Sequence, residues 1–317
     1  MRLKRKSFIY SLLILIVLLG LAYSIGNYFV NYALVYNQGG QNRVEETDTY
    51  KIQENRIVEK SLQDAETYID KHISDIDDIS IQAQDQHSLK GTMYRQNKST
   101  HKWAILVHGY QADEASTHAL IPQFYDKGYH ILTVAMRGHG KSGGQYIGMG
   151  LLDKEDIKSW ANYIVKQDEL SQIVLHGTSM GASTVLFASG IDLPEQVTAI
   201  IADAPYTSII DIFESELKHR FNFPAFPILN ISDIVTQVRA GYSLYDGDVR
   251  KYVRKTEIPI LILQSAKDDF VPPTMAEDLY EVIPGYKQLR IFPEGSHANG
   301  RYHDPKGYYK AIFQFIE

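Results

Sequence analysis

The sequence predicts an α/β fold with a mostly parallel sheet and helices on both faces. From residue 103 onward, short apolar runs of strand length alternate with segments long enough for a helix, which is typical of such sheets. The expected strands cover 103–107, 130–136, 172–176, 197–202, 258–263 and 288–292. The clearest helices are expected at 152–166, 180–188, 274–282 and 306–316. The chain has 317 residues, 44% of them hydrophobic, which is enough to bury one large core.

The start of the chain predicts a membrane helix. Basic residues precede a long apolar stretch, namely Arg2, Lys4, Arg5 and Lys6. No charged residue follows over 7–42, and an apolar helix of about 20 residues spans a bilayer with its basic flank in the cytoplasm. We therefore expect a retained signal anchor over residues 1–35, with the rest of the chain outside the cytoplasm at the cell surface. The alternative is a secretory signal that is cleaved at Ala22-Tyr23-Ser24.

Residues 36–77 are expected to connect the anchor to the main domain. The first part is polar and predicts a linker, whereas 52–73 repeat apolar residues at helical spacing and predict a stalk or brace. Apolar and polar residues then alternate over 79–83 and 89–94, as in a hairpin at a sheet edge. The main domain is therefore expected to cover residues 78–317.

An inserted cap is predicted between two of the strands. More than fifty residues separate the strands that end at 202 and begin at 258, which is too long for a single crossover. We interpret about 205–256 as a cap above the strand ends, where the ligands of open parallel sheets bind. An aromatic stretch within it contains Phe221, Phe223 and Phe226. These rings form either an apolar acyl pocket or the core of the cap itself.

A serine stands at the apex of a predicted strand, turn and helix. The apolar run 173–176 meets Gly177-Thr178-Ser179-Met180-Gly181, and small and apolar residues follow. This arrangement exposes a hydroxyl for attack on a carbonyl, because the glycines leave room on both sides of the nucleophile. Residues 140–144 also fit Gly-x-Ser-x-Gly, but neither a strand directly before them nor a helix after them is predicted. Ser179 is therefore the candidate nucleophile, and Ser142 is interpreted as a loop serine.

The serine requires a histidine base and a carboxylate that orients the histidine. In this type of turn the three residues occur in the order Ser, acid, His. Asp268 and Asp269 follow the strand predicted at 258–263, and His297 follows the last predicted strand. Loops after the carboxyl ends of parallel strands open on the same face of the sheet, so these side chains can converge.

Together these motifs resemble the α/β-hydrolase superfamily. The resemblance rests on the turn around Ser179, on His-Gly-Tyr at 108–110 after the first parallel strand, and on Arg-Gly-His-Gly-Lys-Ser at 137–142. The Asp-Asp-Phe-Val-Pro run and the Gly-Ser-His near the end also match, so the likeness covers nearly all of the predicted main domain. With the N-terminal anchor and residues 203–208, the chain is similar to the membrane-anchored cell-surface hydrolases of Gram-positive bacteria.

The resemblance implies a catalytic role for each of these residues. Ser179 would be the nucleophile, His297 the general base and then acid, and Asp268 the residue that holds the imidazole in the right tautomer. In the family pattern the acid lies four residues before the proline of the Val-Pro pair, which favours Asp268 over Asp269. Asp203 is a further alternative, because some lipases place their acid after that strand.

The resemblance also implies where negative charge is stabilised. The oxyanion hole would consist of the backbone N–H of Tyr110 and that of Met180, which directly follows the nucleophile. Such donors bind the oxygen on which charge develops, and removing one typically slows turnover about 10²- to 10³-fold.

Composition excludes several other functions. The chain has no cysteine, which excludes a thiol nucleophile and cysteine-ligated metals and agrees with export from a cell type that does not build disulfides. The remaining histidines lack a metal-ligand spacing such as His-Glu-x-x-His, so we predict no metal and no cofactor. The net charge is −6 although the N-terminus is basic, so the rest of the chain is acidic and repels nucleic acid.

The predicted function is that of an extracytoplasmic serine hydrolase of the carboxylesterase type, which acts on a small-molecule ester through an acyl-enzyme. A serine peptidase acting on short peptides and an acyltransferase are alternatives, because a triad does not distinguish among them. A surface binding protein that keeps the hydrolase fold without activity is the alternative from another class. If His297 is the base, activity rises with pH as its imidazole loses a proton, and a flat rate between about pH 5 and 8 would contradict this assignment.

Overall fold

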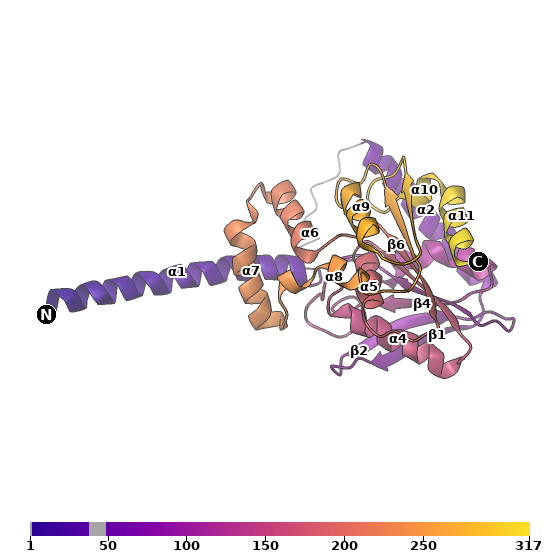
Figure 1. The fold of residues 1–317 in the computed structure, drawn as a ribbon, viewed down its shortest axis with the longest axis horizontal. Coiled ribbons are helices and arrows are strands. Elements are labelled where there is room, and N and C mark those ends of the chain that lie inside the picture. Colours follow the sequence, from indigo (N-terminus) through magenta and orange to yellow (C-terminus); the bar gives the residue numbers. More distant parts are fainter. Residues whose placement is uncertain (1, 38–48) are drawn as a thin grey trace.

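The computed structural model describes residues 2–37 and 49–317, and within them the strands form one eight-stranded sheet (Figure 1). The strand order is β1-β2-β4-β3-β5-β6-β7-β8. The strands are β1 (Ile76–Gln82), β2 (Ser88–Tyr94), β3 (Lys102–Val107), β4 (His130–Ala135), β5 (Gln172–Thr178), β6 (Val197–Asp203), β7 (Ile260–Ser265) and β8 (Lys287–Phe292). The strands from β3 to β8 are parallel, and β2 pairs antiparallel with both β1 and β4 at one edge. The predicted α/β fold with a mostly parallel sheet is confirmed.

Helices cover both faces of the sheet because the strands bury side chains on both sides. In β3, Ile105 packs into the core under one face, and its neighbours Ala104 and Leu106 pack into the core under the other. The first core is shared with α4 (Asp153–Gln167), α5 (Met180–Ser189), α8 (Val249–Val253) and α9 (Pro273–Val282). The second core is shared with η1 (Glu114–Leu120), α3 (Ile121–Asp126) and α11 (Pro305–Ile316). The short helix α10 (Gly300–His303) precedes α11.

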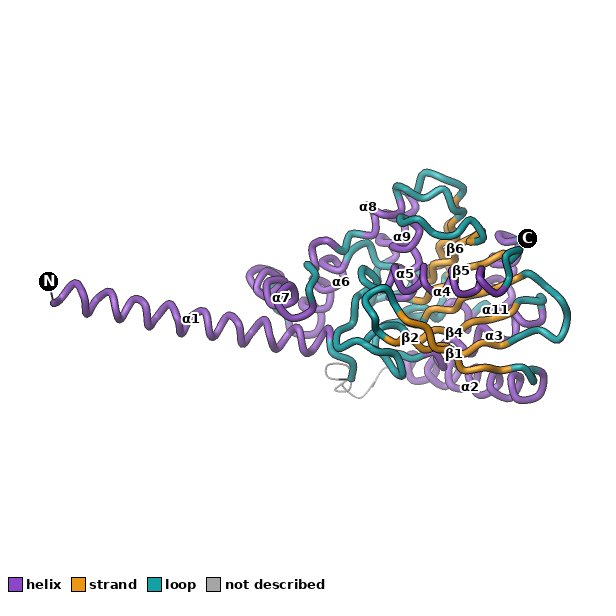
Figure 2. The backbone as a smooth tube through the Cα atoms, turned by 90° about the horizontal axis from the view of Figure 1, so that it is seen from below, coloured by secondary structure: helices purple, strands orange, loops and turns teal. Residues whose placement is uncertain are grey.

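A cap is inserted between β6 and β7. It consists of α6 (Ile209–Glu216), the single π-helical turn η2 (Leu217–Phe221), α7 (Ala225–Ala240) and the short turn η3 (Leu244–Asp246). The helix α7 crosses α1 (Arg2–Leu34) beside the main domain, as both views show (Figures 1 and 2). Gly26 of α1 allows this close crossing, since a Cβ there would lie 2.7 Å from Cγ2 of Val235.

The helix α1 has two parts with different surroundings. It projects far from the main domain, and over Lys6–Leu34 it is long and apolar enough to cross a membrane (Figure 1). The side chains of residues 8–21 are exposed, whereas those of Val30 and Leu34 are buried in the main core. The last two turns of α1 are therefore part of the folded domain.

The helix α2 (Thr49–His72) begins after residues 38–48, which contain the predicted linker and lie outside the described residues. It packs on the face of the sheet that also carries α3, with Ala65 and Ile69 buried. Its N-terminal half buries a charged residue as well, Glu54. The helix α2 thus lies along the main domain, and its N-terminal half lies at the end of the domain that carries the cap.

Candidate active site

Ser179 stands at the turn between β5 and α5. Its backbone has φ 57° and ψ −119°, a strained conformation that non-glycine residues seldom adopt. A Cβ on Gly177 would lie 2.1 Å from the carbonyl oxygen of Gly181, and a Cβ on Gly181 would lie 2.4 Å from that of Val107. Both positions therefore require glycine, which gives the Gly-x-Ser-x-Gly pattern its physical reason.

His297 and Asp268 continue a chain of hydrogen bonds that starts at Ser179. The Oγ of Ser179 lies 2.7 Å from Nε2 of His297, and Nδ1 of His297 lies 2.7 Å from Oδ2 of Asp268. In a neutral imidazole one nitrogen donates and the other accepts, so Nδ1–H donates to the carboxylate and Nε2 accepts from the hydroxyl. The structure therefore brings these three sequence-predicted residues into direct contact.

The loop after β7 fixes the carboxylate of Asp268. The backbone N–H groups of Phe270 and Val271 donate to its Oδ1 at 3.0 and 2.8 Å. The amide Nε2 of Gln264 donates to the other oxygen at 3.0 Å. These donors orient the carboxylate toward the imidazole, so its position does not depend on the histidine alone.

The alternative carboxylates have other partners. Asp269 is exposed and forms an ion pair with Lys51 of α2 at 2.9 Å. Asp203 is buried, where it accepts from the hydroxyl of Tyr308 at 2.8 Å and from Arg301 at 3.2 Å. Burial raises the pKa of Asp203 to about 6, against the opposing effect of the Arg301 charge. Asp203 thus ties β6 to α10 and α11.

Ser142 and three buried histidines, His108, His139 and His176, form hydrogen bonds within the fold. The hydroxyl of Ser142 donates to a carbonyl of β4 at 2.6 Å. Nε2 of His108 accepts from a backbone N–H at 3.0 Å, and Nε2 of His176 lies 3.0 Å from the hydroxyl of Tyr308. Burial lowers the pKa of all three histidines, to about 3 for His139 and His176. Within residues 2–37 and 49–317, no three His, Asp or Glu side chains group as a metal site would require.

The two segments that carry the predicted oxyanion donors lie beside Ser179. Met180 is the first residue of α5, and the first N–H groups of a helix have no acceptor inside it. Gly109, which precedes Tyr110, lies close to the Ser179 side chain, because a Cβ on it would lie 3.9 Å from Oγ of Ser179. The Gly109–Tyr110 backbone and the start of α5 therefore flank the same hydroxyl.

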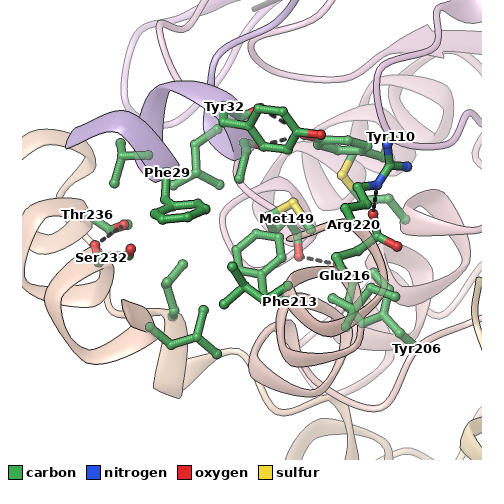
Figure 3. A pocket seen from close by; sticks show the side chains of 18 of the residues that line it. Phe29, Tyr32, Tyr110, Met149, Tyr206, Phe213, Glu216, Arg220, Ser232 and Thr236 are labelled. Carbon is green, nitrogen blue, oxygen red and sulfur yellow. Dashed lines mark hydrogen bonds and ion pairs between the residues drawn. The ribbon is translucent and has the colours of Figure 1, made fainter. Parts of the chain in front are cut away.

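An apolar pocket adjoins Ser179 and extends between the main domain, the cap and α1 (Figure 3). The cap lines it with Ile212, Phe213, Leu217, Phe221, Leu229 and Leu244. The helix α1 lines it with Phe29, Val30, Tyr32, Ala33 and Leu34. The charged side chains in this lining, Glu216 and Arg220, form an ion pair with each other. Such a lining fits an acyl chain better than a polar group.

The three predicted pocket phenylalanines have different positions. Phe221 lines the pocket. Phe223 does not line it and is 48% exposed, but it stacks on the Phe221 ring with 6.2 Å between the ring centroids. Phe226 is 75% exposed and does not line the pocket, so it belongs neither to the acyl pocket nor to a core of the cap, the two predicted alternatives. The backbone at Phe226 is extended, with φ −87° and ψ 134°. Because the helix is broken there, Phe226 does not point in the direction that regular helical spacing from Leu229 would give it.

A more polar cleft meets the apolar pocket at Ser179. It is lined by the loop around His297 and by Lys51, Glu54 and Asn55 of α2. Arg220 of the cap borders both the cleft and the pocket. Ser179 thus has an apolar space on one side and a polar space on the other.

The end of α1 is hydrogen-bonded to the loop that carries a predicted oxyanion donor. The hydroxyl of Tyr110 donates to the carbonyl of Ala33 at 2.8 Å, and the N–H of Ile147 donates to that of Leu34 at 2.8 Å. These bonds satisfy carbonyls that the end of a helix leaves without an intrahelical partner. Sequence reasoning missed this part of the site. The sequence does contain an indication of this contact, because its apolar residues continue to Val35, beyond the length that a membrane span needs.

Sequence reasoning also missed Glu54, which holds the loop that carries His297. Its carboxylate accepts from the backbone N–H of Ser296 at 2.9 Å and from the hydroxyl of the same residue. Nε2 of His303 lies 2.7 Å from the carboxylate as well. Burial raises the pKa of Glu54, but the hydrogen bonds from Ser296, with those from Asn299 and His303, outweigh burial and hold that pKa below its ordinary value. No local motif marks this residue, because its partners lie more than 240 residues away.

Comparisons with known proteins agree with this architecture. Residues 98–229 match the family model described as serine aminopeptidase, S33, and residues 236–317 match that of the PhoPQ-activated pathogenicity-related protein. The Pyrococcus furiosus esterase Pf2001 has a similar fold, with a TM-score of 0.64 and 19% identity over 78% of this chain and 91% of that chain. The chain belongs to the α/β-hydrolase superfamily. This hydrolase carries in addition an apolar N-terminal helix, which fits a membrane anchor or a signal.

Relatives of this hydrolase include proteins of several bacteria. The Bacillus subtilis protein YqkD is 29% identical over 214 residues, which cover 67% of this chain and 70% of that protein. The monoacylglycerol lipase of Mycolicibacterium smegmatis is 26% identical over 231 residues, which cover 63% of this chain and 80% of the lipase. These likenesses indicate a hydrolase of small-molecule substrates and leave open the type of bond that it cleaves.

Proposed function

We propose that this hydrolase is a membrane-anchored serine esterase with Ser179, His297 and Asp268 as its catalytic residues. The observation that carries the proposal is the unbroken hydrogen-bond chain from the Ser179 hydroxyl through His297 to Asp268, with 2.7 Å at each step. A serine hydroxyl is a weak nucleophile by itself and becomes effective when an oriented imidazole accepts its proton. The strained turn at Ser179 supports the same assignment.

The proposed reaction has two half-reactions. Ser179 Oγ attacks the ester carbonyl while Nε2 of His297 takes its proton, and Asp268 stabilises the imidazolium that forms. The backbone N–H groups of Tyr110 and Met180 bind the oxyanion of the tetrahedral intermediate. The intermediate then expels the alcohol, which receives the proton from His297, and leaves an acyl-enzyme. Water attacks that ester with the same base, and the acid product and free Ser179 result.

The pocket supports an ester substrate over a peptide. An aminopeptidase requires a carboxylate for the ammonium group of its substrate, and the acidic side chain in the pocket lining, Glu216, is already paired with Arg220. The apolar lining accepts an uncharged acyl chain without burying an unpaired charge. A serine peptidase is the second candidate, because the family model that matches residues 98–229 is described as a serine aminopeptidase.

The proposal includes a catalytic domain that stays attached to the membrane on its extracytoplasmic side. Four basic residues lie at the N-terminal end of the apolar span, namely Arg2, Lys4, Arg5 and Lys6, and such a basic flank remains in the cytoplasm. Retention is supported by α1 itself, which continues as one helix through the alternative cleavage site at 22–24. Its last turns then line the pocket.

The test is labelling of the full-length protein with a fluorophosphonate probe, together with hydrolysis of short acyl esters and of aminoacyl amides. We expect labelling and ester turnover in the wild type, and loss of both in Ser179→Ala. The matched control is Ser142→Ala, which removes the serine of the other Gly-x-Ser-x-Gly sequence and should keep the label. Absence of labelling in the wild type, or labelling that survives Ser179→Ala, would refute the proposal. Amide turnover far above ester turnover would select the peptidase.

A further inference from the structure

The helix that fits a membrane span is also a wall of the pocket. Phe29, Val30 and Ala33 of α1 line the cavity, and residues of the cap helices line it as well. Figure 3 shows Phe29 of α1 and Phe213 of the cap in this lining. The same helix is apolar and exposed over residues 8–21. One continuous helix therefore joins the apolar interior of a bilayer to the apolar interior of the pocket.

The length of α1 places the pocket close to the bilayer surface. From Lys6 to Gly26 the helix rises about 30 Å, which equals the hydrocarbon thickness of a bilayer. Gly26 is the point at which α7 crosses α1, because a Cβ on it would meet Val235 at 2.7 Å and the carbonyl of Ile231 at 3.0 Å. The cap helix α7 therefore lies at the edge of the hydrocarbon, between the span and the main domain (Figures 1 and 2).

The outer side of α7 has the composition of a membrane-facing surface. Ile234 and Val238 are 62% and 77% exposed, and they lie on the side of the helix away from the pocket-lining Ser232 and Thr236. The exposed positions of α7 carry no charged side chain. This uncharged face combines the apolar Ile234 and Val238 with the polar Asn230 and Gln237, and such a face beside a membrane span fits the interfacial lipid surface.

Aromatic rings lie where the cap meets α1. The ring of Phe221 in the cap meets those of Phe29 and Tyr32 in α1, with centroids 5.5 and 5.3 Å apart. Phe223 stacks on Phe221 and is about half exposed. These ring contacts join α1 to η2, together with a side-chain hydrogen bond between Tyr32 and Arg220. An acyl chain that parts the rings would reach the pocket that Phe221 lines. Aromatic side chains are typical of the level at which lipid meets water.

We propose that the substrate is a long-chain acyl ester of the bilayer, whose chain enters the pocket between α1 and the cap without passing through water. This inference rests on the proposed esterase function and names its substrate class and entry route. The acyl chain occupies the space lined by α1, the ester carbonyl lies at Ser179, and the alcohol portion lies in the polar cleft on the side of His297. The outer face of α7 rests on the lipid surface.

The first test blocks the pocket from α1. Ala33 lines the pocket with a small side chain, and its contact with Tyr110 uses only its backbone carbonyl. In full-length protein in phosphatidylglycerol–phosphatidylethanolamine vesicles, Ala33→Phe should reduce hydrolysis of a bilayer-embedded long-chain monoacylglycerol about tenfold or more. Hydrolysis of a soluble acetate ester should fall at least about tenfold less than that of the embedded ester, because acetate places no long chain beside Ala33. Equal effects on the two esters would overturn the inference while leaving the esterase intact.

The second test does not depend on catalysis. Ser179→Ala protein in the same vesicles is irradiated with a monoacylglycerol that carries a diazirine near the end of its acyl chain. We expect crosslinks in peptides that contain residues 29–34 and 209–236, and loss of these crosslinks in the double variant with Ala33→Phe. Crosslinks confined to residues 8–21, or none, would overturn the inference. If these pocket crosslinks form but the wild type shows no esterase activity, the proposed esterase function is refuted, whereas the inferred binding of an acyl chain in the pocket is not.

The third test concerns the outer face of α7. Val238→Glu should lower hydrolysis of the embedded ester about tenfold and leave the acetate ester unchanged, because a charge is excluded from the lipid surface. The matched control is Leu170→Glu, which places the same charge on an apolar side chain that is 71% exposed before β5. Equal effects of the two variants on the embedded ester would show that α7 does not rest on the lipid.

Discussion

The two N-terminal helices approach Ser179 from opposite sides and make opposite kinds of contact. The helix α1 contributes apolar side chains such as Phe29 and Ala33 to the pocket, and its end binds the Tyr110 loop through backbone carbonyls. The helix α2 contributes Glu54 and Tyr50 to the polar side, where both accept from the loop that carries His297. The difference favours a division of tasks under the proposed function, in which α1 shapes the proposed substrate pocket and α2 aligns the proposed base, His297.

The largest effect is expected from Glu54→Gln. The variant removes the charge that holds Ser296, next to His297, and a displacement of about 1 Å at a catalytic group can slow turnover about 10²-fold. We expect kcat to fall about tenfold to hundredfold with KM nearly unchanged, measured with a short acyl ester. Glu59→Gln, on an exposed position of the same helix, is the control and should behave as wild type. A rise in KM at constant kcat would show that α2 acts on substrate binding, which would contradict the difference drawn between α1 and α2.

Gly26→Leu is expected to act on binding. A side chain at this position meets Val235 and the backbone of Ile231, so α7 and α1 must move apart and the pocket loses its shape. KM for a long-chain ester should rise about tenfold, while kcat for an acetate ester stays within about twofold. The control is Gly20→Leu, because nothing lies within 4 Å of a Cβ at Gly20. Loss of acetate turnover in Gly26→Leu alone would mean that α1 also aligns the catalytic residues.

A smaller effect is expected on the pH dependence of thermal stability, and it concerns the contact of α2 alone. The pKa of Glu54 is lower in the folded chain than its ordinary value of about 4.3, so the ionised side chain stabilises the fold above that pH. This contribution disappears as the pH falls through the folded-state pKa. The difference in Tm between wild type and Glu54→Gln should therefore be largest near neutral pH and shrink below about pH 4. A difference that grows on acidification would contradict the sign of the shift.

The smallest effect is expected from Lys51→Ala. Lys51 of α2 forms an ion pair with Asp269, and both side chains are substantially exposed. Exposed ion pairs contribute about 0–1 kcal/mol, so we expect kcat and KM for a short ester to change less than about threefold. A loss comparable to that of Glu54→Gln would show that alignment by α2 depends on Lys51 as much as on Glu54.

The parts of the site that could be predicted from sequence have local causes. The turn around Ser179 needs glycine at 177 and 181 because of contacts below 2.5 Å, so its pattern is visible in five consecutive residues. The order of strands and loops then places Asp268 and His297 at the same edge of the sheet. The exposed position of Phe226 differs from both predicted alternatives, because a break in helical geometry at one residue leaves no mark in the hydrophobic pattern.

The sequence by itself determined the sheet, the strained serine turn and the apolar N-terminal helix, since each depends on neighbouring residues or on a regular spacing. Only the tertiary structure decided that α1 forms a wall of the pocket and that Glu54 holds the His297 loop. The physical reason is that these contacts join segments more than 70 and 240 residues apart. A carboxylate on a helix and an apolar turn have the same appearance in a sequence whether they face water, lipid or an active site.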